Sequence, residues 1–257
     1  MTRINKLFLE KKADVLNIYC TAGYPRLESL PGILRALQKN RADMVEIGMP
    51  YSDPLADGPV IQQSNMVAIK NGMTIQTLFD QLKDCRSYFD LPLILMGYLN
   101  PVIQFGLEKF CLMAKEVGVD GIILPDLPIR EFNTEFANYF AKAGLDFIFL
   151  ITPETSEQRI REIDSMSKGF IYAVTSSSTT GGHNDLANQL NYFIKLHAMN
   201  LNNPVLAGFG IRDRKTFKIA CRYTRGAIIG SAYILALSSS SDVEATTQHF
   251  LEAIIKE

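Results

Sequence analysis

Short apolar runs recur along the chain, and amphipathic segments separate them. Eight runs rich in β-branched or aromatic residues predict strands: Val15–Thr21, Met44–Met49, Leu93–Tyr98, Gly121–Asp126, Phe147–Thr152, Phe170–Ser176, Val205–Gly210 and Ala227–Ser231. Seven segments between them have helical periodicity, several ending in the Gly or Asn that stops a helix: Leu27–Lys39, Thr74–Tyr88, Gly106–Glu116, Glu131–Ala143, Ser156–Ser165, Asp185–Met199 and Asp213–Arg222.

The alternation of strands and helices is typical of parallel strands joined by helical crossovers. Eight such units within 257 residues predict an α/β fold, a (β/α)8 TIM barrel. An open doubly wound sheet usually has fewer strands and a glycine-rich first turn, which residues 21–25 do not make. No linker rich in Pro, Gly and Ser divides the chain, so we expect a single barrel domain over residues 1–257. The serines at 238–241 favour a local loop, with a disordered segment as the alternative.

Composition and charge exclude several classes of function. With 47% hydrophobic residues and a net charge of −1, the chain is typical of a globular protein, and no charged patch suits nucleic acid or a membrane surface. Charges run through residues 1–12, where a signal peptide needs an apolar core, and the apolar stretch 227–237 is too short to span a bilayer. The four cysteines stand far apart and the three histidines do not cluster. We therefore expect a cytoplasmic protein with reduced thiols and no metal site.

One predicted strand carries a charged residue inside its apolar run. Glu46 interrupts the run from Met44 to Met49, and the loop after it carries two more carboxylates, Asp53 and Asp57. An unpaired buried carboxylate is costly, so Glu46 is either part of an active site or a salt-bridged acid in the core. The clustering of acids favours the active site.

In a barrel the carboxyl ends of all strands meet on one face, where catalytic groups gather. Glu46 would lie within the second strand, Asp57 in the loop after it, Tyr98 at the end of the third strand and Tyr172 within the sixth. A partly buried strand carboxyl suits a proton donor, and a loop carboxylate that folds over substrate suits an acceptor. Asp126, at the end of the fourth strand, stands between two prolines, so a structural role in the turn is favoured.

Three glycine-containing segments follow successive strands towards the C-terminus: residues 179–182, 207–211 and 229–232. Glycine lets backbone amides approach a ligand closely, and a helix starting at Ser231 would add its positive end. Each glycine pair alone fits an ordinary tight turn equally well. Three at successive strand ends predict a phosphate site. The residues alone thus indicate a barrel enzyme that acts on a small phosphorylated metabolite by acid–base catalysis, without a cofactor.

At these residues the chain resembles the tryptophan synthase alpha chain family, and the resemblance spans essentially the whole sequence. The segment EIGMPYSDPLADGP at 46–59 is similar to the family signature. TAG at 21–23, GYLNP at 97–101, TTG at 179–181, GFGI at 208–211 and GS at 230–231 occur in the family order. The resemblance implies a lyase of tryptophan biosynthesis that splits indole-3-glycerol phosphate, by a retro-aldol step, into indole and D-glyceraldehyde 3-phosphate.

The resemblance also implies catalytic roles. Glu46 would protonate the indole ring carbon that carries the side chain, and would also accept the side-chain hydroxyl proton. Asp57 would take or stabilise the proton on the indole nitrogen. Tyr172 would position these acids through its hydroxyl, although a barrel-lining aromatic is an equally good interpretation.

The remaining substrate contacts implied by the resemblance form two groups. The first is an apolar slot for indole, for which packing in the barrel core is the alternative: Tyr19, Met96, Tyr98, Ile123 and Ile151. The second holds the phosphate end: Thr180, Gly181, Phe209, Gly210, Gly230 and Ser231. One departure lies in the loop after the sixth strand, where Ser176 replaces the arginine of many family members and removes a positive charge near the phosphate. His183 is expected to face solvent there.

A partner is implied as well. Family members work in an alpha2beta2 complex whose beta chain carries pyridoxal phosphate, so no cofactor is expected in this chain. Asp53 and Pro54 would face the beta chain and couple loop closure to it. A stand-alone indole-3-glycerol phosphate lyase that releases free indole is the alternative, and a phosphosugar epimerase or isomerase or a non-catalytic scaffold ranks below it.

Overall fold

The computed structural model describes residues 1–175, 183–208 and 210–256. Within them, nine parallel strands form one sheet in the order β5-β4-β3-β2-β1-β9-β8-β7-β6. The strands are β1 (Val15–Thr21), β2 (Met44–Gly48), β3 (Leu93–Met96), β4 (Gly121–Ile123), β5 (Asp146–Phe147), β6 (Leu150–Ile151), β7 (Ile171–Val174), β8 (Val205–Gly208) and β9 (Gly226–Ile229).

The sheet curls until its two end strands meet. β5 and β6 are consecutive in the chain, with Ile148 and Phe149 between them. The Ile148 N–H donates to the Ile122 carbonyl on one side, and the Phe149 carbonyl accepts from the Tyr172 N–H on the other. The stretch predicted as one strand, 147–152, is therefore two short strands, β5 and β6. Together they occupy one of the eight strand positions around the barrel. This arrangement confirms the (β/α)8 barrel.

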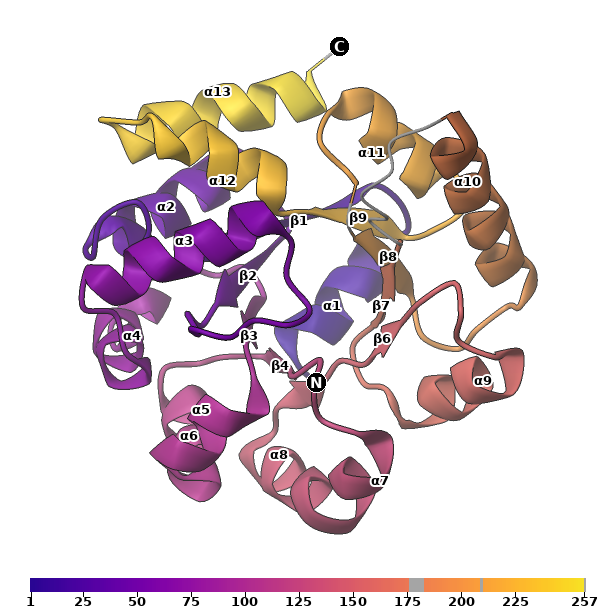
Figure 1. The fold of residues 1–257 in the computed structure, drawn as a ribbon, viewed down its shortest axis with the longest axis horizontal. Coiled ribbons are helices and arrows are strands. Elements are labelled where there is room, and N and C mark those ends of the chain that lie inside the picture. The colour runs from indigo at the N-terminus through magenta and orange to yellow at the C-terminus, as the bar shows by residue number, and fades with distance from the viewer. Residues whose placement is uncertain (176–182, 209, 257) are drawn as a thin grey trace.

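Helices surround the strands (Figure 1). They are α1 (Arg3–Glu10), α2 (Ser29–Lys39), α3 (Pro59–Lys70), α4 (Ile75–Leu82), α5 (Leu99–Phe105), α6 (Leu107–Glu116), α7 (Ile129–Glu131), α8 (Ala137–Ala143), α9 (Glu157–Met166), α10 (His183–Ala198), α11 (Arg214–Cys221), α12 (Ser231–Ser238) and α13 (Val243–Ile255). A 3-10 turn spans Cys85–Ser87, and a π-helical turn spans Phe132–Phe136. Helix α1 buries Ile4 and Phe8 against the amino end of the barrel, where Ile4 reaches Gly121 at the start of β4.

Several predicted boundaries need correction. β3 ends at Met96, so Tyr98 lies beyond it as the residue that precedes α5, and β4 ends at Ile123, so Asp126 belongs to the following loop. The predicted helices 74–88 and 131–143 are each broken, by the 3-10 turn and by the π-helical turn. Helices α1, α3, α5 and α13 were not predicted, whereas α12 starts at Ser231 as expected, and serines 239–241 join α12 to α13.

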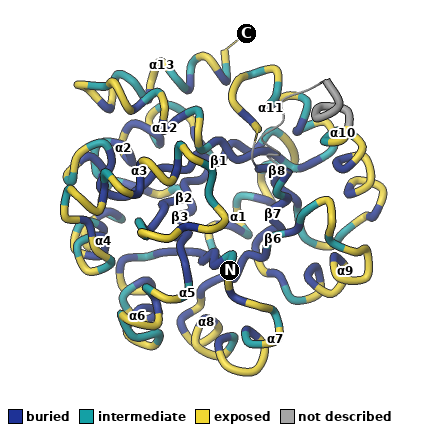
Figure 2. The backbone as a smooth tube through the Cα atoms, viewed as in Figure 1, coloured by how far each residue is buried: buried dark blue, intermediate teal, exposed yellow. Residues whose placement is uncertain are grey.

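The strands are buried on both faces, as Figure 2 shows. Both faces are covered because the barrel interior fills with side chains and helices pack outside, so each strand reads as a nearly continuous apolar run. Two polar side chains interrupt these runs while fully buried, Asn17 in β1 and Glu46 in β2. In the described part of the chain, no helix is long and apolar enough to cross a membrane.

Candidate active site

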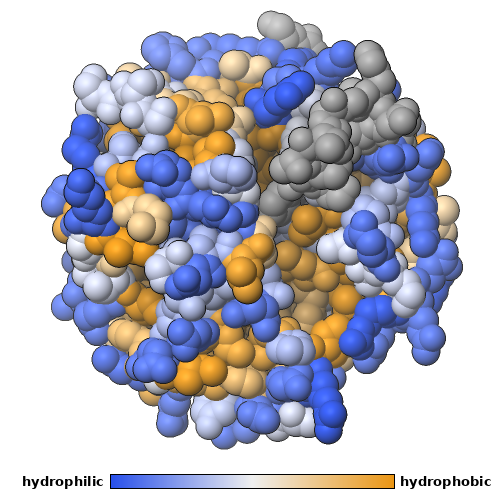
Figure 3. Space-filling view, viewed as in Figure 1, coloured by the Kyte–Doolittle hydropathy of each residue, from blue (hydrophilic) through white to orange (hydrophobic). Residues whose placement is uncertain are grey.

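A cavity of about 440 Å³ opens at the carboxyl ends of the strands. Apolar side chains gather in the hollowed centre of this face (Figure 3). The loop between β2 and α3 crosses in front of the strands here (Figure 1). The wall residues come from β1, β2, β3, β7 and β9, from the loops after β2, β8 and β9, and from the first turns of α3 and α12: Tyr19, Glu46, Asp57, Gly58, Pro59, Val60, Ile61, Met96, Tyr172, Gly210, Ile211, Arg212, Ile228, Gly230, Ser231, Ala232 and Leu235.

Glu46 lies at the inner end of this cavity. Strand register places it beside Tyr19 of β1 and Ile94 of β3. Its side chain is fully buried, and its Oε2 accepts a hydrogen bond from Asn17 Nδ2 at 3.2 Å. Burial raises the pKa of the Glu46 carboxyl to about 8; the Asn17 hydrogen bond lowers it, and the charge of Asp57 raises it further. No ion pair to Glu46 occurs among the described residues, so the alternative of a salt-bridged core acid has no support there.

Asp57 approaches the same cavity from the loop. Its side chain is half-buried, and its Oδ2 accepts a hydrogen bond from the Tyr98 hydroxyl at 3.2 Å. Burial raises the pKa of Asp57 to about 6, against the opposing effect of hydrogen bonds from Tyr98 and Asn65. The Tyr98 oxygen also accepts from the Ala56 N–H at 2.9 Å. Tyr98 therefore holds the loop and its carboxylate in place.

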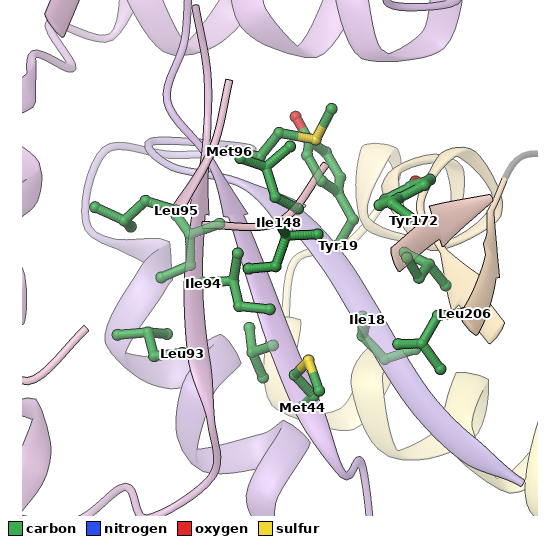
Figure 4. Packing of buried hydrophobic residues seen from close by; sticks show 14 of the residues in the cluster. Ile18, Tyr19, Met44, Leu93, Ile94, Leu95, Met96, Ile148, Tyr172 and Leu206 are labelled. Carbon is green, nitrogen blue, oxygen red and sulfur yellow. The ribbon is translucent and has the colours of Figure 1, made fainter. Parts of the chain in front are cut away.

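Two tyrosines stand near the acids because glycines on adjacent strands make room for them. A Cβ on Gly48 would overlap the Tyr19 ring, and a Cβ on Gly208 would overlap the Tyr172 ring. Figure 4 shows both tyrosines at the same end of the packed strands as Met96. Burial first, and then the nearby carboxyls, raise the pKa of each phenol well above its usual value. Both hydroxyls consequently stay protonated and can donate hydrogen bonds.

Glycines and one cation also line the cavity. Gly210 has a φ of +72°, which favours glycine, and Gly230 directly precedes α12, whose first residue is Ser231. Arg212 lines the cavity here and is mostly exposed, with its Nε 3.8 Å from Asp213. Arg212 was not predicted as a site residue, although a basic residue directly after the GFGI segment is a visible signal. The expected residues Thr180, Gly181 and Phe209, and also Ser176, lie outside the described residues.

Several other expected residues are absent from the described walls of the cavity. Ile123 and Ile151 are fully buried in β4 and β6 and are absent from its described walls, so their substrate contact stays a prediction. Asp126 accepts hydrogen bonds from the Leu99 N–H at 3.0 and 3.1 Å, which supports the structural role favoured for it. Asp53 is exposed and accepts from the Ser52 hydroxyl, whereas Pro54 is buried within the chain.

A wider hollow of about 840 Å³ lies at the opposite end of the barrel, beside α1 and the loops that enter β8 and β9. Its described walls contain cations and amides, such as Arg222, Arg225 and Asn203, but no Asp or Glu. His197 lines this hollow, but no pair of carboxyls does, so the smaller cavity with Glu46 and Asp57 is the better candidate active site. In the part of the chain described, no cluster of His, Cys, Asp and Glu suits a metal ion.

Comparison with known proteins agrees with this geometry. A family profile described as Tryptophan synthase alpha chain matches residues 6–256. The tryptophan synthase alpha chain of Flavobacterium psychrophilum is 50% identical over 241 residues, which cover 93% of this chain and 95% of that one. The crystal structure of the alpha chain from Legionella pneumophila superposes with a TM-score of 0.88 at 30% identity, covering 99% and 96% of the two chains. A chain in the tryptophan synthase complex of Pyrococcus furiosus gives 0.85 at 30% identity, covering 96% of this chain and 100% of that one. With a profile match over nearly its whole length and a relative half identical to it, the chain belongs to the tryptophan synthase alpha chain family.

Proposed function

We propose that this chain cleaves indole-3-glycerol phosphate into indole and D-glyceraldehyde 3-phosphate. The observation that carries this proposal is the pair of carboxyls, Glu46 and Asp57, on one cavity with an apolar wall and a glycine-lined end. Burial raises the pKa of the first to about 8 and of the second to about 6. Near neutral pH Glu46 therefore holds a proton while Asp57 is ionised, which is the division of labour that a proton donor and an acceptor need.

The chemistry follows from these protonation states. Glu46 gives its proton to the indole ring carbon that bears the glycerol phosphate side chain, and Asp57 stabilises the positive charge that then develops on the ring nitrogen. Glu46, now a carboxylate, takes the proton of the side-chain hydroxyl. The carbon–carbon bond breaks, its electron pair restores the indole ring, and the former hydroxyl carbon becomes the aldehyde. The enzyme ends in the protonation state in which it began.

The cavity walls fit the two ends of this substrate. Tyr19 and Met96 offer an apolar surface for the indole ring, and Tyr172, on the same cavity, would position the acids through its hydroxyl. The backbone amides near Gly210 and at the start of α12, around Gly230 and Ser231, suit the phosphate. Contacts from Thr180, Gly181 and Phe209 stay predictions.

Arg212 compensates for the departure from the family pattern at Ser176. It is a cation on the wall beside Gly230 and Ser231, where the phosphate is expected. Its guanidinium is mostly exposed, and its one ion pair within the described residues is a 3.8 Å contact with Asp213, so it is available to a phosphate. Many family members carry a positive charge in the loop after the strand that corresponds to β7. In this chain the loop before α11 supplies that charge through Arg212.

The proposed assembly is an alpha2beta2 complex with a tryptophan synthase beta chain, in the cytoplasm. A relative from Pyrococcus furiosus occurs in a tryptophan synthase complex, which supports the pairing. Asp53 is exposed on the loop that carries Asp57, and the neighbouring Leu55 is 94% exposed, so this loop presents both charge and apolar surface to a partner. Pro54 packs inward and would stiffen the loop. The pyridoxal phosphate would belong to the beta chain.

Indole release from indole-3-glycerol phosphate tests the proposal. Wild type, Glu46→Gln and Asp57→Asn are assayed with and without a tryptophan synthase beta chain, and Glu108→Gln, the same change at an exposed position of α6, is the matched control. We expect turnover that rises with the beta chain, is lost in both active-site variants and is kept in the control. Rapid turnover that ignores the beta chain would favour the stand-alone lyase, and absence of turnover in wild type would overturn the proposed substrate.

A further inference from the structure

Asn17 is a buried amide directly beside the proposed proton donor. It lies in β1, paired in register with Met44 of β2 and Ile228 of β9, and its side chain is fully buried. Its Nδ2 donates to Glu46 Oε2 at 3.2 Å. Among the described residues, Asn17 Oδ1 and Glu46 Oε1 each lack a hydrogen-bond partner. A buried amide with an idle acceptor costs free energy, so packing alone does not explain an asparagine at this position.

The position of Asn17 separates it from the substrate. Side chains alternate along a strand, so Asn17 shares the interior face of β1 with Tyr19 and Thr21. Tyr19 lines the active-site cavity, but Asn17 is absent from its walls and lies one step nearer the amino end of the barrel. Any effect of Asn17 on the reaction therefore passes through Glu46.

A carboxamide matches the two forms that Glu46 adopts during the proposed reaction. An ionised carboxyl accepts hydrogen bonds only, whereas a protonated one also needs an acceptor for its O–H. The amide carries a donor and an acceptor on one rotatable group, and a half turn about its last side-chain bond exchanges them. The idle Oδ1 of Asn17 is the acceptor that a protonated Glu46 requires.

We propose that Asn17 is a positioning residue that serves both protonation states of Glu46: its Nδ2–H donates to the carboxylate, and after a half turn its Oδ1 accepts from the carboxyl O–H. This inference deepens the proposed function, since it assumes that Glu46 both gives and takes a proton. It links the function of the buried Asn17 amide in β1 to that of the buried Glu46 carboxyl in β2.

Among the described residues, the hydrogen bond that Glu46 accepts comes from Asn17. The titratable groups that act on or feel Glu46 are Asp57 from the β2–α3 loop, Tyr19 and Cys20 from β1, and Tyr172 from β7. Its register neighbour on β3 is the apolar Ile94. None of these groups is a cation. The hydrogen bond from Asn17 is the influence that lowers the pKa of Glu46 against burial and the charge of Asp57.

The test compares three variants of the full chain. Asn17→Leu keeps the size and removes both donor and acceptor, Asn17→Asp keeps only acceptors, and Ile18→Val is the control in the same strand. The titration of Glu46 is followed by carbon-13 NMR of its side-chain carboxyl, with Glu46→Gln identifying the signal. Turnover of indole-3-glycerol phosphate is measured on the same samples, with circular dichroism as the check on folding.

For Asn17→Leu we expect the Glu46 midpoint to rise by about one pH unit, because the hydrogen bond lost to the charged form is stronger than the one lost to the neutral form. The same variant loses about tenfold in kcat with KM nearly unchanged, since Asn17 does not touch the substrate. Asn17→Asp raises the midpoint further, because two carboxyls then share one site. Ile18→Val leaves the midpoint and kcat unchanged. If Asn17→Leu fails to fold, Asn17→Ala replaces it.

A Glu46 midpoint that does not move in Asn17→Leu overturns the inference, and so does a loss of kcat with an unmoved midpoint, which marks a merely structural residue. The titration does not depend on the substrate. If wild type fails to cleave indole-3-glycerol phosphate while the midpoint still shifts in Asn17→Leu, the proposed function fails and the link between Asn17 and Glu46 stands.

Discussion

Buried carboxylates have different hydrogen-bond and ion-pair partners at the two ends of the barrel. At the amino end, Asp120 accepts from Arg86 Nη2 at 2.8 Å and from the Leu93 N–H at 3.0 Å, and it pairs with Arg3 at 3.2 Å. At the carboxyl end Glu46 is at least as deeply buried, yet its one hydrogen bond among the described residues comes from an uncharged amide. Asp120 has cationic partners that stabilise a buried negative charge. Glu46 has no cationic partner among the described residues, so its negative charge is poorly stabilised.

Two further buried acids at the amino end, Asp164 and Asp146, also differ in their hydrogen-bond donors. Asp164 accepts from the backbone N–H groups of Asn202 and Asn203, each at 2.8 Å. Asp146 accepts from uncharged donors of Thr2 and Asn5, and burial raises the pKa of its carboxyl. The partners of a buried acid thus decide its state. Charged or backbone donors hold a carboxylate firmly, whereas burial without them raises the pKa of the carboxyl, as for Asp146 and Glu46.

The largest expected effect is on kcat, from a substitution of Glu46 at the carboxyl end of the barrel. Glu46→Gln removes the proton donor but keeps the shape and a buried neutral group, so we expect about a thousandfold loss of kcat for indole release. The free energy of unfolding at neutral pH should stay equal to that of wild type or rise. Indole assays and urea unfolding on one preparation check both, and a variant that loses stability together with activity would place Glu46 among the structural acids.

The complementary change acts at the amino end. Asp120→Asn leaves Arg86 and Arg3 without their carboxylate, so we expect the free energy of unfolding to fall by about 3 kcal/mol. The carboxyl end is untouched, and kcat per folded molecule should therefore match wild type. Urea unfolding and active-site assays measure the two quantities, and Asp126→Asn, which keeps one acceptor for the Leu99 N–H, gives a milder comparison.

The pH dependence of stability sharpens the contrast. The pKa of Glu46 is about 8 in the folded chain against an ordinary 4.5, so between these values the folded state holds a proton that the unfolded state has released. Its contribution is complete below about pH 4.5 and is lost as the pH rises through about 8, at about 1.4 kcal/mol per pH unit. We expect that slope in the difference between the unfolding free energies of wild type and Glu46→Gln, measured by urea unfolding between about pH 4.5 and 8. Equal slopes in the two proteins would mean that Glu46 is ionised throughout.

The smallest expected effect concerns the phosphate end. Arg212 is largely exposed, so Arg212→Ala should raise KM for indole-3-glycerol phosphate by only about fivefold, equal to about 1 kcal/mol, with kcat nearly unchanged. Added salt should weaken the binding of wild type more than that of the variant. Arg222→Ala, a cation at the opposite end of the barrel, is the control. An equal KM in all three proteins would remove Arg212 from the phosphate site.

The strands of the barrel were predicted from the sequence more accurately than the helices around them. The strands are apolar on both faces, so their runs were visible, and β1 was predicted to the residue. Helix α3 was missed because its buried face includes the polar residues Ser64 and Asn65, which hide the helical period. Helix α13 likewise buries Thr247 against the Tyr233 hydroxyl. The break between β5 and β6 could not be read from a continuous apolar run.

The same logic explains which parts of the site could be predicted. Glu46 and Asp57 were visible because a charge in an apolar strand and a carboxylate in the next loop are rare enough to mark a site. Asn17 interrupts an apolar run in the same way, but it is uncharged and belongs to no motif, and its meaning depends on the register that brings β1 beside β2. The link from Tyr98 to Asp57 spans 41 positions and needed the fold.

The most direct test of this account is the pKa of Glu46 in the intact wild-type chain, measured by carbon-13 NMR of the glutamate carboxyls with Glu46→Gln to identify the signal. The contrast between the two ends of the barrel predicts a midpoint near 8, which leaves Glu46 protonated at neutral pH and able to act as the donor. A midpoint near the ordinary 4.5 would show that Glu46 is held as an anion, like Asp120, and would contradict the account.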